Sequence, residues 1–116
     1  MHQGPQGISR LNTVPLKPGM ILSVEPGVYL EGKLGIRLEN LVCVKKKSGN
    51  SKQNKGFLQF ETLTLVPFEK KLIEKNLLSR DELHWLNSYH DNVYSKLSPI
   101  LNVSEKTWLR YACGIL

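Results

Sequence analysis

Hydrophobic and polar residues alternate through the first half of the chain with the two-residue period of β-strands. The clearest alternation runs over residues 35–45 and predicts one continuous strand. One face of this strand carries apolar side chains at Ile36, Leu38, Val42 and Val44. Shorter apolar runs at 20–25 and 28–30 predict two more strands, and a turn at 31–33 follows the second of them. Residues 57–66 alternate again and are expected to pair antiparallel with 35–45.

After the last strand the hydrophobic period changes to that of a helix. Ser79 and Glu82 have the spacing of a capping box, which predicts a helix start. Beyond this start, residues spaced by three and four form one stripe: Leu83, Leu86, His90, Val93 and Leu97. Pro99 should end this helix, and a cap at Ser104 predicts a shorter helix that stops at Gly114. Strands first and helices last place the chain in the α+β class.

Two interpretations of this pattern remain open. The chain has 116 residues and starts with a Gly- and Pro-rich segment over 1–19, which predicts an irregular loop. Three or four strands and one helical hairpin enclose only a small core. The chain is therefore either a small domain in its own right or a larger domain truncated at its start. In the second case the strands should leave an uncovered apolar face.

Composition narrows the class of protein. Hydrophobic residues make up 41% of the chain and charged residues 22%, as in ordinary globular proteins. No apolar run approaches the roughly 18 to 20 residues of a membrane span, and the first ten residues lack the apolar centre of a secretory signal. The cysteines, Cys43 and Cys113, are far apart and have no CxxC spacing. We therefore expect a cytoplasmic protein without a membrane partner.

The net charge of +6 raises the question of nucleic-acid binding. The lysines concentrate over 45–55, among Ser, Gly and Asn and without an aromatic residue. A nucleic-acid platform would combine basic residues with aromatic side chains on which bases stack. The segment is therefore better interpreted as a solvated hairpin tip, and we expect no nucleic-acid partner.

Two carboxylates in the strand region are candidates for chemistry. Glu25 and Glu39 lie on strand segments separated by tight turns, and Arg37 shares the face of Glu39 because strand side chains alternate. Such a group is most often a solvated cross-strand ion pair. The alternative is a divalent-metal site, because carboxylate oxygens are the ligands that hard cations prefer. Spacing alone favours the ion pair.

The histidines differ in their surroundings. His2 lies in a polar, Gly-flanked loop and is suited to proton transfer, although such a residue is more often simply exposed. His84 and His90 belong to the first helix, and His90 is expected to pack in the core with one nitrogen hydrogen-bonded. Aromatic residues form a second edge of this helix, which predicts core packing or a subunit interface: Trp85, Tyr89 and Tyr94.

Four segments together resemble a known family: "HQGPQGIS", "PLKPGMILSVEPGVYLEGKLGIRLENLV", "LQFETLTLVPFEKKLI" and "WLNSYH". They are similar to the C-terminal part of Xaa-Pro aminopeptidase (aminopeptidase P), in its long form with a C-terminal extension. The resemblance implies the C-terminal part of a pita-bread catalytic domain over residues 1–68 and a helical extension over 69–116. It also implies a metallopeptidase whose substrate is a peptide with proline in second position.

The resemblance assigns roles to four residues. Family members bind two metal ions, usually manganese, through two aspartates, a histidine and two glutamates. Glu25 and Glu39 match the two glutamates, and Glu25 would also serve as the acid-base residue. His2 matches a histidine that contacts the substrate, and Arg37 matches an arginine that supports the ligand shell. The resemblance thus favours the metal site over the plain ion pair.

The departures from the family pattern limit this expectation. Gln3 stands where the family usually has glutamate, and the two aspartates and the metal-binding histidine should lie upstream of His2. A fragment with two of five ligands should be inactive alone and should bind Mn²⁺ only weakly. Its expected partner is the missing N-terminal half of the enzyme. The alternative is a noncatalytic dimerisation or interaction module, because long-form members form homodimers in which the extension takes part.

Overall fold

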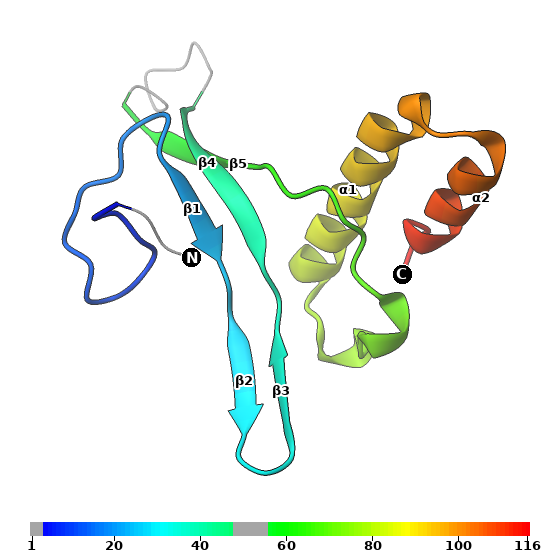
Figure 1. Cartoon of the computed structure of the whole chain (residues 1–116), viewed down its shortest axis with the longest axis horizontal. Helices are drawn as coiled ribbons and strands as arrows, with labels where there is room; N and C mark the ends of the chain where they lie inside the picture. The colour runs from blue at the N-terminus through cyan, green and yellow to red at the C-terminus, as the bar shows by residue number, and fades with distance from the viewer. Residues whose placement is uncertain (1–3, 48–55) are drawn as a thin grey trace. The chain divides into compact units, whose positions relative to one another are not determined.

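The computed structural model of the chain describes residues 4–47 and 56–116 (Figure 1). Two compact units make up the chain, Met1–Thr64 and Leu65–Leu116. The first unit is built from antiparallel strands and the second from helices, so the predicted α+β class is confirmed.

The first unit contains five strands: β1 (Ile21–Val24), β2 (Gly27–Leu30), β3 (Leu34–Arg37), β4 (Asn40–Lys46) and β5 (Leu58–Thr62). Strands β1, β4 and β5 form a three-stranded sheet in the order β1-β4-β5, and β2 pairs with β3 in a two-stranded sheet. All these pairs are antiparallel, which confirms the expected pairing of the last strand with the segment before it.

The prediction of one continuous strand over 35–45 was wrong, because Leu38 and Glu39 separate β3 from β4. The cause lies in Pro26 on the opposite strand, which has no backbone N–H to donate across the ladder. Leu38 N–H still donates to the Pro26 carbonyl at 3.0 Å, but no bond returns. The ladder is therefore interrupted at the same level on both strands.

Both ladders share one register across this interruption. Val24 faces Asn40 at the end of the β1–β4 ladder, and Gly27 faces Arg37 at the start of the β2–β3 ladder. The same register therefore sets Glu25 opposite Glu39 and Pro26 opposite Leu38 between the two ladders. The four strands β1 to β4 thus form one long ribbon with a central gap, visible in Figure 1.

The core of the first unit is small and lies on one face of the larger sheet. Leu22, Val42 and Val44 are buried, with Leu16 and Met20 packed against them. On the far half of the ribbon, the same face carries five side chains that are exposed among the described residues: Val28, Leu30, Leu34, Ile36 and Leu38.

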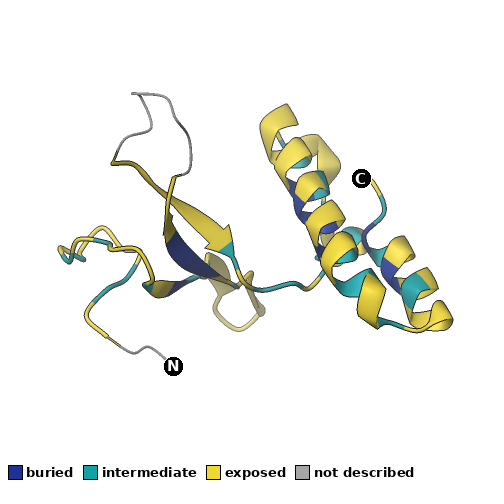
Figure 2. Ribbon diagram, turned by 90° about the horizontal axis from the view of Figure 1, so that it is seen from above, coloured by how far each residue is buried: buried dark blue, intermediate teal, exposed yellow. Residues whose placement is uncertain are grey.

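The second unit contains α1 (Arg80–Leu97) and α2 (Val103–Ala112), with short 3₁₀ turns at Lys70–Leu72, Lys75–Leu77 and Ser98–Ile100. The predicted capping box is present, because Glu82 N–H donates to Ser79 Oγ and Ser79 N–H donates to the Glu82 carboxylate. The core joins both helices and consists of Tyr89, Val93, Leu109 and Cys113. Figure 2 shows this buried stripe along α1.

The start of α2 differs from the prediction of a cap at Ser104. Asn102 caps the helix instead: its side chain accepts from Glu105 N–H at 3.0 Å. The Glu105 carboxylate accepts in turn from Asn102 N–H at 2.9 Å, which completes a capping box. Ser104 lies in the first turn, where its hydroxyl donates to the Asn102 side chain.

Adjacent residues of α1 hold the extended segment that precedes the 3₁₀ turns. The Tyr89 hydroxyl accepts from Val66 N–H at 3.3 Å and donates to the Val66 carbonyl at 2.9 Å. His90 Nε2 accepts from Phe68 N–H at 3.1 Å, and the His90 side chain is fully buried. The expectation of a packed His90 with one hydrogen-bonded nitrogen is confirmed. Tyr89 belongs to the core, as expected for one of the two alternatives.

Candidate metal centre

The two candidate carboxylates lie in the central gap of the ribbon. Glu25 follows β1 and Glu39 precedes β4, so neither residue belongs to a ladder. The shared register of the two ladders sets Glu25 directly opposite Glu39. Side chains that face each other across antiparallel strands project from the same side of the sheet. The interruption caused by Pro26 therefore coincides with the place where the two carboxylates meet.

Arg37 bridges the two carboxylates. Its Nη1 lies 3.4 Å from Glu25 Oε2, and its Nε lies 3.6 Å from Glu39 Oε2. The side chains of Arg37 and Glu39 are 50% and 45% exposed, and that of Glu25 is 27% exposed. At this exposure the ion pairs contribute little to stability. Their main effect is to offset the repulsion between two carboxylates held at neighbouring positions.

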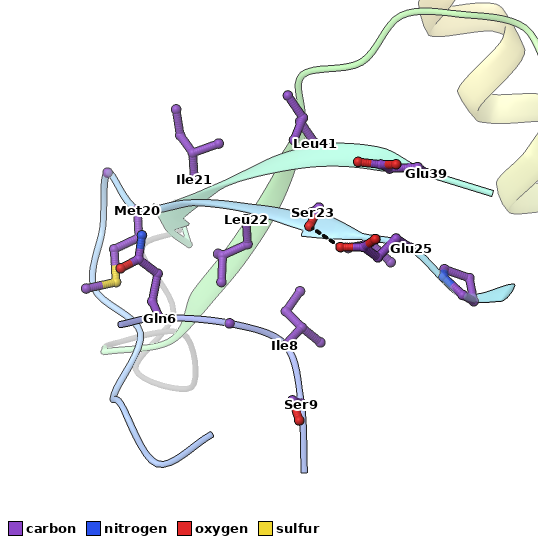
Figure 3. A pocket seen from close by; sticks show the side chains of 14 residues that line it. Gln6, Ile8, Ser9, Met20, Ile21, Leu22, Ser23, Glu25, Glu39 and Leu41 are labelled. Carbon is purple, nitrogen blue, oxygen red and sulfur yellow. Dashed lines mark hydrogen bonds between the residues drawn. The ribbon is translucent and has the colours of Figure 1, made fainter. Parts of the chain in front are cut away.

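Ser23 also contacts Glu25, which the sequence analysis missed. The Ser23 hydroxyl donates to Glu25 Oε1 at 2.7 Å (Figure 3). Ser23 precedes Glu25 by two residues, so both side chains project from the same face of the strand. This period-two spacing is the sequence signal that points to a contact between Ser23 and Glu25.

A hollow of about 980 Å³ in the first unit reaches the two carboxylates. Glu25, Glu39 and Ser23 supply polar groups to its wall, and Met20, Ile21, Leu22 and Leu41 supply apolar ones. The loop over 6–9 forms another part of the wall, with Ile8 and Ser9 drawn in Figure 3. The carboxylates are thus bordered by a largely apolar surface.

Tyr29 is a second residue that the sequence analysis did not single out. Its ring lies over Gly27 and Gly35 on the face that also carries Arg37. A Cβ added at Gly35 would stand 2.9 Å from Tyr29 Cδ1, and one at Gly27 would stand 2.7 Å from the hydroxyl oxygen. The two glycines therefore leave the space that this ring occupies.

The described part of the chain does not hold a full set of metal ligands. His2 lies outside the described residues, so its predicted role has no geometry here. Within 4–47 and 56–116, no group of three or more His, Cys, Asp or Glu side chains could hold a metal ion. The donor set is two carboxylates, which suits a hard divalent cation but leaves most of its coordination sphere unfilled. Among the helices of the same residues, none has the length and apolar character needed to span a membrane.

Comparisons with known proteins extend this description. Residues 1–46 match the metallopeptidase family M24, and residues 56–116 match the C-terminal region of peptidase_M24. A probable Xaa-Pro aminopeptidase P of Laccaria bicolor is 43% identical over 122 residues, and aminopeptidase P1 of Arabidopsis thaliana is 40% identical over 116. These alignments cover 100% and 97% of this chain but only 19% and 18% of the relatives. The chain thus spans about 19% of the length of the first of these relatives.

A solved structure gives the same result. The X-prolyl aminopeptidase from Caenorhabditis elegans, described as a cytosolic enzyme with a di-nuclear active site, superposes with a TM-score of 0.78 at 34% identity. The match covers 87% of this chain and 17% of that enzyme. The predicted resemblance and the predicted C-terminal part of a pita-bread fold are both confirmed. The chain therefore belongs to the metallopeptidase family M24, of which it carries the C-terminal region.

Proposed function

We propose that the chain is the C-terminal part of a dinuclear-metal Xaa-Pro aminopeptidase, which removes an N-terminal residue that precedes proline. The observation that carries the proposal is the ribbon register, which sets Glu25 opposite Glu39 in the gap between two ladders. In this proposal Glu25 and Glu39 would both hold divalent metal, with Mn²⁺ as the expected ion. The named relatives and the di-nuclear site of the Caenorhabditis elegans enzyme support it.

The side chains of the gap have distinct roles in this proposal. When bound, the two ions would polarise the scissile carbonyl and acidify water. Glu25 takes a proton from the attacking water and returns it to the leaving amine. Arg37, which contacts both carboxylates, keeps them together and carries positive charge beside the substrate. We assign His2 a contact with the substrate, as the resemblance to the family implies.

Cleavage requires ligands that Glu25 and Glu39 do not supply. Two carboxylates cannot fill the six or so oxygen positions of a divalent ion, so the chain alone should be inactive. The missing ligands are assigned to the upstream part of the catalytic domain, as the partner of this chain. Residues 1–68 would complete that domain and 69–116 would form the extension. The cytosolic description of the structural neighbour supports a cytoplasmic location.

A second role for the extension is subunit association. Trp108 and Tyr111 on α2 are 63% and 70% exposed, and Trp85 on α1 is exposed and stacks on Tyr89 at 5.6 Å. Exposed aromatic residues are enriched at interfaces between proteins. A homodimer formed through the extension is compatible with the catalytic proposal, and it is the alternative if the chain has no part in catalysis.

Calorimetric titration with manganese tests the metal proposal. The chain alone should give no saturable heat at micromolar concentrations, because three of the five ligands are absent. A mixture with the upstream part of the catalytic domain, made from the Laccaria bicolor relative, should bind about two ions with much higher affinity. Tight binding by the chain alone, or no binding by the mixture, would contradict the proposal.

A further inference from the structure

We propose that Ser23 is a positioning residue that fixes the carboxylate of Glu25 before a metal ion binds. The inference rests on the proposed function, since it assigns Ser23 a part in building the metal centre. Ser23 would touch neither substrate nor metal and would act only through Glu25. The basis is the hydrogen bond from Ser23 Oγ to Glu25 Oε1 and the position of both residues in the ribbon.

The backbone explains why Glu25 needs such a partner. Ser23 lies inside β1 and faces Leu41 of β4, so its backbone is fixed by the ladder. Glu25 lies just beyond the end of β1, in the gap that Pro26 imposes. Its backbone has no ladder position, and a glutamate side chain has several rotatable bonds to restrict. A hydroxyl held on the adjacent ladder is therefore an effective anchor for this carboxylate.

The two oxygens of Glu25 are engaged from different sides. Oε1 accepts from Ser23 at 2.7 Å, the length of a strong charge-assisted bond between a hydroxyl and a carboxylate. Oε2 lies 3.4 Å from Arg37 Nη1, a looser contact to a half-exposed side chain. Ser23 thus sets the plane of the carboxylate more firmly than Arg37 does. A carboxylate oxygen has more than one lone pair, so the bond from Ser23 does not by itself prevent Oε1 from binding a cation.

The expected effect concerns metal affinity. Groups that orient a metal ligand through a hydrogen bond typically change affinity or activity by about 10- to 100-fold when they are removed. Ser23→Ala should therefore weaken manganese binding by a mixture with the upstream part of the domain by about 10- to 100-fold. Ser23→Thr keeps the hydroxyl and should bind close to wild type. A purely structural role for Ser23 would not produce this recovery.

Ser9→Ala provides the matched control. Ser9 lines the same hollow, but its hydroxyl accepts from Leu11 N–H within the loop. Its removal should leave manganese affinity unchanged. Equal losses in Ser9→Ala and Ser23→Ala would show a general effect of hydroxyl removal from the hollow and would overturn the inference.

A second measurement needs no metal. The ¹³C signal of the Glu25 carboxylate in the 116-residue chain, recorded at neutral pH, reports the hydrogen bond directly. It should shift in Ser23→Ala and stay near wild type in Ser23→Thr and Ser9→Ala. Coincident Glu25 signals in all four proteins would overturn the positioning role. If the wild-type mixture binds no manganese, the proposed function fails, and the carboxylate signal still decides whether Ser23 holds Glu25.

Discussion

Replacing Glu39 with Gln should lower Xaa-Pro cleavage at least about 100-fold in a mixture of this chain with the upstream part of the catalytic domain. The estimate is a lower bound, because removal of a residue that merely orients a ligand already costs about 10- to 100-fold. Glutamine keeps the size of the side chain but removes its charge, and a neutral amide is a poorer ligand for a hard divalent cation than a carboxylate. The measurement is kcat/KM for an Xaa-Pro peptide at saturating manganese.

Glu61→Gln is the control for this prediction. Glu61 is an exposed carboxylate on β5 of the same unit, paired with Lys45 at 3.2 Å, and it does not line the hollow. Its substitution removes the same charge from the same unit and should leave kcat/KM close to wild type. If Glu39→Gln were as active as wild type, Glu39 would not be a metal ligand and the prediction would be wrong.

Acidification below about pH 6.5 should destabilise the helical unit through His90. Burial lowers the pKa of His90, and the charge of Lys70 lowers it further, while Asp91 opposes the shift. His90 Nε2 accepts from Phe68 N–H. Protonation of Nε2 would turn it into a donor that faces the Phe68 N–H donor, so this hydrogen bond would be lost. Nδ1 is buried and has no hydrogen-bond partner among the described residues, which adds to the cost of charging the ring.

The direction of the effect follows from proton linkage. The unfolded chain binds a proton at the ordinary histidine pKa, whereas the native chain binds it only at lower pH. Stability therefore falls as pH drops from the unfolded pKa to the native one, and below the native pKa this contribution changes no further. The Cys113 thiol in the core of the same unit has a pKa raised by burial and stays neutral across this range.

Urea unfolding of the chain between pH 7.5 and 5 measures this contribution, with α1 helicity as the signal. His90→Gln should remove most of it, because an amide can accept from Phe68 N–H but does not titrate. His84→Gln is the control, since His84 is an exposed histidine of the same helix and its loss should leave the pH profile unchanged. A pH profile that is unchanged in His90→Gln would contradict the role assigned to His90.

Local signals in the sequence predicted much of the fold. The capping box at Ser79 and the helical stripe through His90 and Val93 were sufficient for α1, because both depend on residues close in sequence. The interruption between β3 and β4 was missed because alternation continues through Leu38 and Glu39. Its cause is Pro26 on the facing strand, so it depends on a pairing that the pattern of one strand cannot show.

The candidate site was predicted to a similar extent. Tight turns between the strand segments were enough to predict that Glu25 and Glu39 converge, and the structure places Arg37 in contact with both carboxylates. The hydrogen bond from Ser23 depends on side-chain rotamers, which the sequence does not specify. The Tyr29 ring fits over Gly27 on its own strand and Gly35 on the facing strand, because neither glycine has a side chain. The sequence alone does not show that Gly35 faces Tyr29, since this depends on the register of the two strands.

Cleavage of an Xaa-Pro peptide in the presence of manganese tests the central claim most directly. Three samples are compared: this chain alone, the upstream part of the catalytic domain alone, and their equimolar mixture. We expect release of the N-terminal residue only in the mixture, because each part carries an incomplete set of metal ligands. Cleavage by the upstream part alone at the rate of the mixture would show that Glu25 and Glu39 are not needed. No cleavage in a mixture that forms a stable complex would equally contradict the account.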